Sequence, residues 1–427
     1  MDAEKLYAIY RKCTGVSTDT RTLQPGNIFF ALKGEQFDGN RFAGEALKKG
    51  ALFAVIDDAT LAVDNRYVVV DNALSALQQL ARYHRSKLTI PFIGLTGSNG
   101  KTTSKELVST MLAKKYNVFA TKGNLNNHIG VPLSVLSVKP ETEIAVIEMG
   151  ANHVGEIAAL CGIARPTHGF ITNIGKAHIG TFGGFENIVR GKTELYDYLQ
   201  EAGGTVFINS QNTILMRFAH RFKNTVRYPS PEDYCHCELL SADPYVRIRM
   251  ENGLEVQTQL PGRYNFENIA VALCVAKYFG VPAADAAAAL AAYVPVNMRS
   301  QVVQKGSNTI LLDAYNANPT SMKAALENLA EMKAPRKVAI LGDMFELEEE
   351  AEKEHEAIGR LLTCLDINEV YLCGKLMKSA AGACEYARHF ENKQQLAGYL
   401  SEHPLTGALV LIKGSRGMAL ETLIDLL

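Results

Sequence analysis

The sequence predicts an α/β protein made of three domains. A chain of 427 residues is too long for a single hydrophobic core. Short apolar runs rich in Val, Ile and Phe alternate with segments of helical periodicity, which is the pattern of mostly parallel sheets covered by helices. The pattern of expected strands and helices changes twice along the chain, so we expect domains at residues 1–85, 86–298 and 299–427.

Residues 1–85 predict a small α/β domain. The first residues, MDAEKLYAIYRKC, mix charges into a short helical pattern and lack the apolar stretch of a signal peptide. Helices are expected near residues 41–50 and over 73–87, and strands at IFFALKG (28–34), LFAVID (52–57) and YVVVD (67–71).

Residues 86–298 predict a central, mostly parallel sheet covered by helices. The pattern begins with the strand FIGLTG (92–97) and the helix KTTSKELVSTMLAKK (101–115). Further buried strands are expected at 143–150, 167–175 and 204–210, and further helices at 184–200, 265–280 and 283–294.

Residues 299–427 predict a second, Rossmann-like α/β unit. Strands are expected at 308–316, 337–344, 369–375 and 407–415, with helices over 321–333 and up to Thr363. The acidic run ELEEEAEKEHEAIG (346–359) is typical of a solvated helix face.

Composition narrows the class of protein. A net charge of −1 argues against binding nucleic acid by charge alone, and no apolar run approaches the roughly 20 residues of a membrane-spanning helix. Eight scattered cysteines are typical of reduced core thiols, and Cys235-His236-Cys237 lacks the second ligand pair of a zinc site. We therefore expect a cytoplasmic protein, by default a monomer.

The stretch TGSNGKTT (96–103) indicates a phosphate-binding loop between a strand and a helix. The usual pattern G-x-x-x-x-G-K-[ST] has a glycine where this chain has Leu95, so the loop is a variant. Its glycines allow backbone N–H groups to curl around phosphate at a helix N-terminus, and its lysine can reach the outer phosphates. The expected ATP-binding residues of the loop are Gly97, Ser98, Asn99, Gly100, Lys101, Thr102 and Thr103.

One residue of the loop, Thr102, and one residue outside it, Glu148, are the predicted ligands of a Mg²⁺ ion at this sheet edge. The Thr102 hydroxyl is placed to bind Mg²⁺. Glu148 ends a buried strand at the edge where open α/β sheets bind ligands, so a second oxygen ligand for Mg²⁺ is expected there.

The variant loop and the motifs that follow it resemble the Mur ligase family, whose members join amino acids or peptides to a UDP-linked muramic acid precursor of the bacterial cell wall. Four segments and the N-terminal stretch 17–39 are similar to the family members that add D-alanyl-D-alanine to UDP-N-acetylmuramoyl-tripeptide. The four segments are GNLNNHIGVP (123–132), DAYNANPTSM (313–322), LGDMFELE (341–348) and KGSRGM (413–418).

The resemblance implies an ATP-dependent acid–D-amino-acid ligase of peptidoglycan synthesis. The N-terminal domain would bind the UDP precursor, and the central P-loop-type domain would bind ATP. The reaction would pass through an acyl phosphate and a tetrahedral intermediate, giving ADP and phosphate.

The resemblance also implies the metal and nucleotide ligands. His178 matches a ligand of a second Mg²⁺, and Lys192 matches a lysine that the family carries as a CO2-derived carbamate, although a helical lysine is otherwise an ordinary surface charge. Ala177 stands where the family has an acid and receives no role. Asn268 would contact adenine, Asp313 the ribose and Arg299 the γ-phosphate.

Substrate contacts are implied in three groups. The UDP portion would contact Ser17, Thr20 and Arg21. The path of the precursor to the acyl phosphate would be lined by Asn124, Asn126 and Asn127. The dipeptide would contact Asn316, Asn318, Ser415 and Arg416. Because these residues lie on three domains, we expect the enzyme to close around its substrates.

Two alternatives stay open at this point. One is another ATP-dependent amide ligase of the same scaffold, such as a folylpolyglutamate synthase or a Mur ligase that adds a single amino acid. The other is a P-loop ATPase that acts as a switch, for which His178 and Lys192 would have no metal-binding role.

Overall fold

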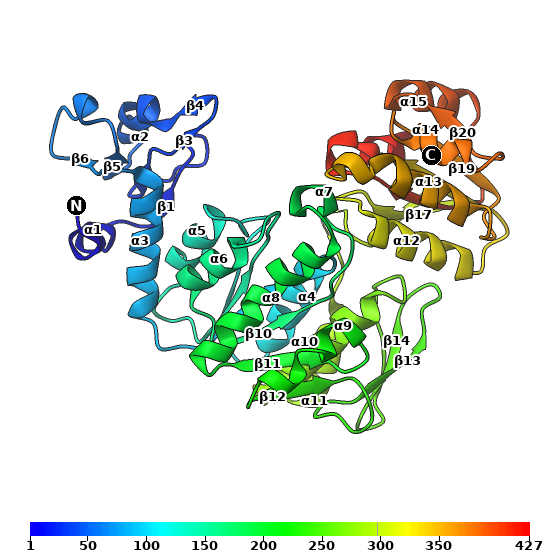
Figure 1. Cartoon of the computed structure of the whole chain (residues 1–427), viewed down its shortest axis with the longest axis horizontal. Helices are drawn as coiled ribbons and strands as arrows, with labels where there is room; N and C mark the ends of the chain where they lie inside the picture. The colour runs from blue at the N-terminus through cyan, green and yellow to red at the C-terminus, as the bar shows by residue number, and fades with distance from the viewer. Residues whose placement is uncertain (297) are drawn as a thin grey trace.

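The computed structural model describes residues 1–296 and 298–427 and arranges them as three α/β bodies in chain order (Figure 1). The N-terminal and C-terminal bodies lie at opposite ends of the molecule, and the central body lies between them. No helix in the described ranges has both the length and the apolar character needed to cross a bilayer. The three-domain α/β prediction is confirmed, whereas the exact limits at 85 and 298 stay a prediction.

The N-terminal body is a parallel sheet of order β1-β2-β5-β6. The expected strand at 28–34 is divided, because β2 ends at Phe30 and the chain then turns into a small hairpin. The elements are α1 (Ala3–Tyr10), β1 (Val16–Ser17), β2 (Ile28–Phe30), β3 (Lys33–Gly34), β4 (Phe37–Asp38), α2 (Ala43–Lys48), β5 (Phe53–Ile56) and β6 (Tyr67–Val69).

Helix α3 (Ala73–Ser86) leads from this body into the central one. Its N-terminus is capped by the Asn72 side chain, which accepts from the backbone N–H of Ser75. At its other end the Arg85 guanidinium donates to the carbonyl of Ala164 at 2.8 Å and lies 3.8 Å from the centre of the Phe92 ring. Helix α3 is thereby anchored to the central domain.

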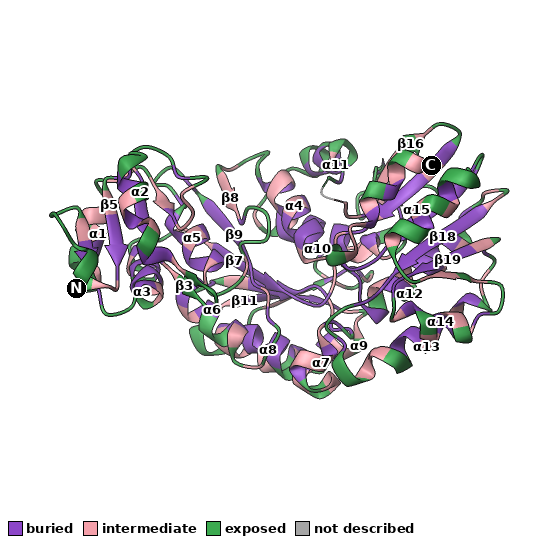
Figure 2. Cartoon of the chain, turned by 90° about the horizontal axis from the view of Figure 1, so that it is seen from above, coloured by how far each residue is buried: buried purple, intermediate pink, exposed green. Residues whose placement is uncertain are grey.

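The central body contains a six-stranded, entirely parallel sheet of order β12-β11-β10-β7-β9-β8. Its strands are buried between helices whose outer faces are exposed (Figure 2). The strands are β7 (Phe92–Thr96), β8 (Val118–Ala120), β9 (Ile144–Glu148), β10 (His168–Ile171), β11 (Thr205–Asn209) and β12 (Thr225–Tyr228); the helices are α4 (Lys101–Leu112), α5 (Gly130–Leu136), α6 (Glu156–Ala164), α7 (Ile179–Phe182), α8 (Phe185–Ala202), α9 (Thr213–Met216), α10 (Asn265–Tyr278) and α11 (Ala283–Ala292).

A separate antiparallel sheet was not expected in this body. Strands β13 (Cys237–Ser241), β14 (Arg247–Met250) and β15 (Glu255–Gln257) form it, with buried and exposed residues alternating along β14 and β15. Alternation of this kind fits a sheet with one face on the core and one in water.

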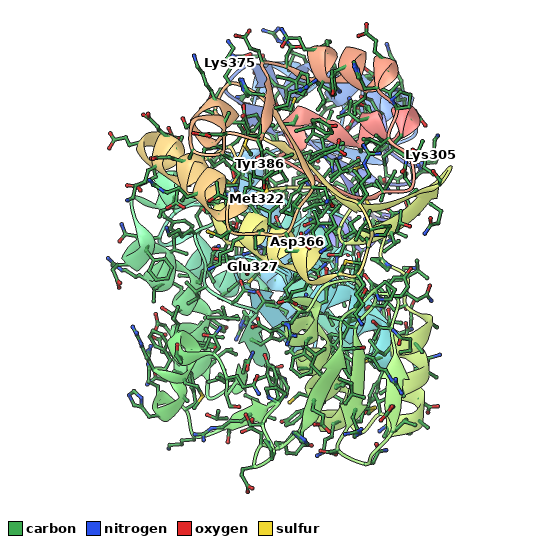
Figure 3. The ribbon with its side chains drawn as sticks, turned by 90° about the vertical axis from the view of Figure 1, so that its right-hand side faces the viewer. Lys305, Met322, Glu327, Asp366, Lys375 and Tyr386 are labelled. Carbon is green, nitrogen blue, oxygen red and sulfur yellow. The ribbon has the colours of Figure 1, made fainter. Side chains whose placement is uncertain are left out.

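The C-terminal body is a mixed sheet of order β16-β17-β21-β18-β19-β20, in which β16 alone is antiparallel to its neighbour. Figure 3 views it end-on: Asp366 and Lys375 are exposed, whereas Met322 on α12 is fully buried. Its elements are β16 (Gln301–Lys305), β17 (Asn308–Asp313), α12 (Pro319–Glu331), β18 (Lys337–Gly342), α13 (Ala351–Leu362), β19 (Glu369–Cys373), α14 (Met377–Gly382), β20 (Arg388–Phe390), α15 (Lys393–Glu402) and β21 (Leu409–Lys413).

Candidate active site

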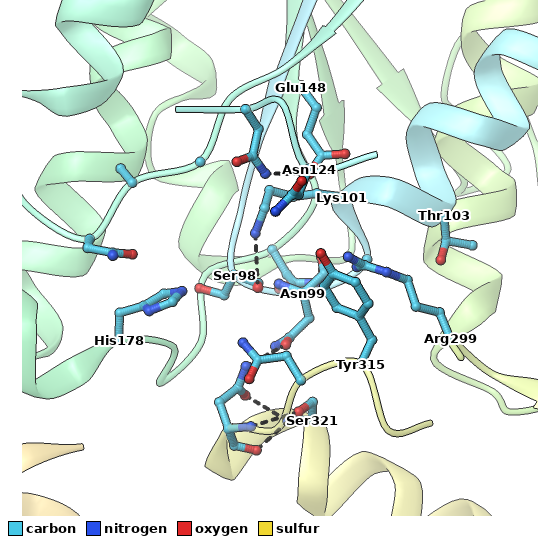
Figure 4. Close-up of a pocket in the computed structure, with 18 of the residues that line it drawn as sticks. Ser98, Asn99, Lys101, Thr103, Asn124, Glu148, His178, Arg299, Tyr315 and Ser321 are labelled. Carbon is cyan, nitrogen blue, oxygen red and sulfur yellow. Dashed lines mark hydrogen bonds between the residues drawn. The ribbon is translucent and has the colours of Figure 1, made fainter. Parts of the chain in front are cut away.

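A cavity of about 1000 Å³ lies at the carboxyl ends of β7 and β9 and extends to the C-terminal domain (Figure 4). Open parallel sheets bind ligands at this edge. The sequence-predicted residues that line it are Ser98, Asn99, Gly100, Lys101, Thr103, Asn124, Asn126, Asn127, Glu148, His178, Asn268, Arg299, Asp313, Asn316 and Asn318.

The loop between β7 and α4 has the backbone that the sequence predicts. Gly97 and Gly100 have φ of 143° and 76°, in the region that side chains rarely adopt. A Cβ on Gly97 would lie 2.0 Å from the Thr172 hydroxyl oxygen, and one on Gly100 would lie 2.3 Å from the Asn268 side-chain oxygen. Both positions therefore require glycine.

The loop is fixed by the segment that follows β10. The backbone N–H of Asn99 donates to Oδ1 of Asn173 at 3.0 Å, and the Ser98 hydroxyl donates to the carbonyl of Gly175 at 3.0 Å. The loop is thus preorganised before any ligand arrives, with its N–H groups at the start of α4.

The Lys101 side chain folds back over its own loop. Its Nζ donates to the carbonyl of Gly97 at 2.8 Å and to that of Ser98 at 3.4 Å, the second of which is drawn in Figure 4. Burial lowers the pKa of Lys101, the nearby Glu148 opposes this shift, and Arg299 adds to it. An anionic ligand in the loop would compensate the ammonium and favour its charged form.

Glu148 is buried at the end of β9 and accepts hydrogen bonds from two elements. Oγ1 of Thr102, in the first turn of α4, lies 3.1 Å from Oε2, and Nδ2 of Asn126 donates to Oε1 at 2.9 Å. The ammonium of Lys105 lies 3.8 Å from Oε2. A carboxylate and a hydroxyl therefore meet where the sequence predicts Mg²⁺.

His178 lies at the start of α7 and faces the C-terminal domain. Its Nδ1 is 2.7 Å from Oε2 of Glu346, and both residues have positive φ, 56° and 64°. The contact with His178 holds the pKa of the Glu346 carboxyl below its usual value. Two non-glycine residues in this region indicate a junction held by its surroundings.

The acidic run 346–359 is not the fully solvated face that we expected. Glu354 and His355 are buried. Oε1 of Glu354 accepts from the Lys176 ammonium of the central domain at 2.5 Å, and Nε2 of His355 accepts from the backbone N–H of Met344. The prediction was wrong for these residues because the central domain covers Glu354, while His355 packs against the segment after β18 of its own domain.

Lys192, on α8, is 1% exposed and is not among the residues that line the cavity. Its Nζ donates to the carbonyl of Ala151 at 2.9 Å, three residues beyond Glu148, and Ala151 itself lines the cavity. Burial and then the nearby Lys101 lower the pKa of Lys192 to about 7, although Glu156 and Glu194 oppose the shift. The neutral amine that carbamylation requires is therefore accessible near pH 7.

The C-terminal domain brings cations to the cavity. The Arg299 guanidinium carbon lies 3.6 Å from the centre of the Tyr315 ring (Figure 4). The Lys413 ammonium, 1% exposed, donates to Asp313 at 2.5 Å and to the carbonyl of Asn316 at 3.3 Å. Asp313 therefore keeps one ion pair while it faces the cavity.

Asn268 belongs to a buried amide network. Its Oδ1 accepts from the Ser104 hydroxyl at 2.9 Å, and its Nδ2 donates to Asn265, which in turn donates to the carbonyl of Pro261. The network fixes the side chain directly beside Gly100.

The central and C-terminal domains are already in contact at the phosphate loop between β7 and α4. Nδ2 of Asn318, the N-cap of α12, donates to Oδ1 of Asn99 at 2.8 Å. An open form would leave Arg299 and Asp313 far from the phosphate loop, but here they line the same cavity.

Several expected substrate residues lie elsewhere. Arg21 is exposed and its guanidinium pairs with Asp19, which also bonds with Ser17; neither these residues nor Thr20 line the cavity. Ser415 is buried and accepts from the backbone N–H of Phe345. Arg416 is exposed, with its guanidinium 4.9 Å from the Tyr315 ring centre.

Comparison with known proteins decides the family. Family models match three successive ranges: "Mur ligase family, catalytic domain" at 12–85, the Mur ligase middle domain at 95–276, and "Mur ligase, glutamate ligase domain" at 298–416. The UDP-N-acetylmuramoyl-tripeptide–D-alanyl-D-alanine ligase of Bacillus subtilis is 36% identical and covers 96% of this chain and 92% of its own. The chain belongs to the Mur ligase family.

Solved structures of other Mur ligases share its architecture. MurF ligase from Thermotoga maritima, in complex with ADP, is 28% identical with a TM-score of 0.84, over 96% of each chain. The UDP-N-acetylmuramoylalanyl-D-glutamyl-2,6-diaminopimelate–D-alanyl-D-alanyl ligase from Acinetobacter baumannii is 30% identical with a TM-score of 0.83, over 99% of this chain and 97% of its own.

The cavity of this Mur ligase also includes residues that the sequence analysis missed. Tyr315 and Lys413 lie inside two of the quoted motifs, so the motifs themselves could have indicated them. Glu346 likewise lies inside the quoted motif 341–348, whereas Gln78 and Arg82 reach the cavity from α3. No sequence pattern distinguishes Gln78 and Arg82 from ordinary surface residues.

Proposed function

We propose that this Mur ligase joins D-alanyl-D-alanine to the terminal carboxylate of UDP-N-acetylmuramoyl-tripeptide at the expense of ATP, as a cytoplasmic step of peptidoglycan precursor synthesis. One observation carries the proposal. A phosphate loop, a buried carboxylate and the cations of a second domain line one cavity in a chain similar over nearly its full length to ligases of this name.

The chemistry requires activation of the acid. A carboxylate oxygen attacks the γ-phosphorus of ATP, the bond from that phosphorus to the bridging oxygen breaks, and ADP leaves. The amine of the dipeptide then attacks the acyl carbon and loses a proton. The tetrahedral intermediate expels phosphate as the amide forms.

Cations and positioning supply most of the catalysis, because the first step brings several negative charges together. Lys101 would leave the Gly97 carbonyl and bind the outer phosphates, beside the N–H groups at the start of α4. Arg299 would meet the γ-phosphate from the C-terminal domain. Its Nε is buried without a hydrogen-bond partner in the described residues, so a ligand oxygen would satisfy it.

The residues present fit Mg²⁺ at the first metal position. Thr102 and Glu148 offer a hydroxyl and a carboxylate 3.1 Å apart, and hard cations prefer such oxygens. In the described ranges no group of three or more His, Cys, Asp and Glu side chains could hold a metal ion by itself. Mg²⁺ commonly uses one or two carboxylates together with water and substrate phosphates, so this set is sufficient.

A second Mg²⁺ would be held by His178 and by Lys192 as a carbamate. The lowered pKa of Lys192 supports formation of the carbamate, because CO2 reacts with the neutral amine. The Glu346 carboxylate, 2.7 Å from Nδ1 but without the alignment of a hydrogen bond in the described residues, would hold the imidazole at this position by its charge. The metals would neutralise charge on the transferred phosphoryl group.

The remaining ATP contacts follow from the cavity. Asn268 beside Gly100 is the candidate for adenine, and Asp313 for the ribose hydroxyls. Ser98, Asn99 and Thr103 line the phosphate end.

Substrate contacts are proposed in the same way. The acyl substrate would pass Asn124, Asn126 and Asn127, with its UDP portion on the N-terminal domain near Ser17, Thr20 and Arg21. The dipeptide would enter past Asn316 and Asn318. Its carboxylate would meet the exposed Arg416, and Ser415 would support the loop of Phe345.

A coupled phosphate-release assay tests the function. UDP-N-acetylmuramoyl-tripeptides and UDP-linked dipeptides are offered as acyl substrates, and D-alanyl-D-alanine and single amino acids as amines. We expect phosphate release only with a tripeptide and D-alanyl-D-alanine together. Release with a single amino acid would favour another ligase of this scaffold, and rapid hydrolysis of ATP alone would favour an ATPase switch.

A further inference from the structure

We propose that Arg82 is a specificity-determining residue that binds a free carboxylate on the peptide stem of the acyl substrate. This inference rests on the proposed function. It concerns the part of the cavity farthest along α3 and α6, which the ATP and metal ligands do not use.

Two helix faces form this part of the cavity. On α3, Gln78 and Arg82 are one turn apart and both line it. On α6, Glu156, Ala159, Leu160 and Ile163 have the spacing of one helical face and line the same space. The two faces form a groove that is continuous with Lys101 and Glu148, and we call it the α3–α6 groove.

The groove is held in place by contacts at both ends of the α3 face. Nε2 of Gln78 donates to the carbonyl of His128 at 3.0 Å, which ties α3 to the segment just before α5. Arg85, one turn after Arg82 and two turns after Gln78, donates to the carbonyls of Ala164 and Arg165 at the end of α6. Arg82 therefore projects from a fixed helix.

Arg82 is available for a ligand. It is exposed and lines the cavity, and no salt bridge or hydrogen bond of its guanidinium is found within residues 1–296 and 298–427. Arg85, by contrast, uses its guanidinium on three backbone carbonyls. One arginine thus anchors the helix, and the other is a free cation on the groove.

The acyl substrate offers matching groups. A stem such as alanyl-D-glutamyl-2,6-diaminopimelate, which the A. baumannii relative carries in its name, has free carboxylates on its glutamyl and diaminopimelate residues besides the one that is activated. A guanidinium binds carboxylate with two parallel hydrogen bonds. Ala159, Leu160 and Ile163 offer apolar contact to the methylene groups between them.

The test measures kcat and KM for Arg82→Ala, with Lys87→Ala as the control. Lys87 is an exposed cation just beyond α3 and does not line the cavity. For Arg82→Ala we expect the KM of the tripeptide substrate to rise about tenfold or more, with kcat and the KM values of ATP and dipeptide within about twofold. Arg82→Lys should lie between, and Lys87→Ala should match the wild type.

Modified stems identify the carboxylate. If Arg82 binds the diaminopimelate carboxylate, the rise in KM caused by Arg82→Ala should disappear with a substrate that has lysine as its third residue. If Arg82 binds the glutamyl carboxylate, the rise in KM should persist with the lysine substrate and disappear when the glutamyl carboxylate is amidated. Calorimetric binding of the tripeptide substrate without ATP gives a second readout, and Arg82→Gln replaces Arg82→Ala if the latter does not fold.

Two failures are distinguishable. Suppose that the wild type turns over the tripeptide. If the KM of Arg82→Ala then matches the wild type for every stem, or rises by the same factor with the diaminopimelate, lysine and amidated stems, this inference is overturned and the proposed function stands. If the wild type turns over no tripeptide, the proposed function is overturned and the inference with it.

Discussion

The hydroxyl of Thr102 lies 3.1 Å from the carboxylate of Glu148, although the two residues belong to different elements. Thr102 is in the first turn of the helix after the phosphate loop, and Glu148 ends the neighbouring strand. The contact joins the phosphate end of the cavity to its proposed metal end. Each prediction below tests one part of that arrangement or of the fold that holds it.

Replacing Lys101 by alanine should reduce kcat by about 10²- to 10³-fold or more, because the loop would lose the cation that meets the charge on the outer phosphates. Phosphate release under saturating substrates measures the loss. Lys114→Ala, an exposed lysine just after α4, is the matched control and should retain wild-type activity. A near-normal kcat for Lys101→Ala would remove the loop from the mechanism.

Lys192→Ala should lower kcat about a hundredfold, and small carboxylates such as acetate should restore part of it by taking the place of the proposed carbamate. The measurement is kcat against acetate concentration, with chloride at equal ionic strength as the control. Lys192→Arg keeps a cation but cannot form this carbamate. Full activity of Lys192→Arg would rule the carbamate out.

Binding of substrates should make the molecule more compact. Ser17, Thr20 and Arg21 lie outside the cavity, so a UDP precursor held by them must bring its acyl end to Lys101. Small-angle scattering should show a smaller radius of gyration with an ATP analogue plus precursor than with the analogue alone. Identical scattering curves would argue against closure.

His168→Phe should weaken the loss of stability in acid. Burial lowers the pKa of His168 to about 4, from an ordinary value of 6.5, and its ring contacts Tyr278 and Phe279. Between these pH values the unfolded chain binds a proton that the folded chain does not, so the folded state loses stability as pH falls from 6.5 towards 4. Phenylalanine keeps the aromatic contacts and removes this effect.

The contribution of His168 to the loss of stability in acid is measured by comparing thermal unfolding midpoints at pH 7.5 and pH 5. The fall in midpoint should be smaller for His168→Phe than for the wild type by about 1–4 °C. The value at pH 7.5, where the histidine is neutral in both states, is the internal control for packing. An equal or larger fall in the variant would show that His168 does not titrate as its burial implies.

The fold and the phosphate end of the cavity follow largely from local patterns. A few consecutive residues are enough to predict each of three elements: the strand before Gly97, the helix after Gly100 and the apolar strand that ends at Glu148. Parallel strands then bring their carboxyl ends to one edge, and this explains why Thr102 and Glu148 could be expected to meet.

Other features depend on contacts between distant segments. The strands β13, β14 and β15 are only three to five residues long, so their alternation is too brief to stand out from the mostly parallel pattern around them. Arg82 and Glu354 are ordinary charged residues in sequence. Arg82 lies on a groove only because α6 packs beside α3. Glu354 has a partner only because Lys176 of the central domain approaches α13.

The most direct test of the central claim is a crystal structure with a non-hydrolysable ATP analogue and Mn²⁺ in place of Mg²⁺. The proposal predicts the β- and γ-phosphates against the backbone N–H groups of residues 97–102, and an anomalous Mn²⁺ peak bonded to Thr102 and Glu148. A nucleotide bound elsewhere, or a loop that holds phosphate with Glu148 distant from any metal, would contradict it.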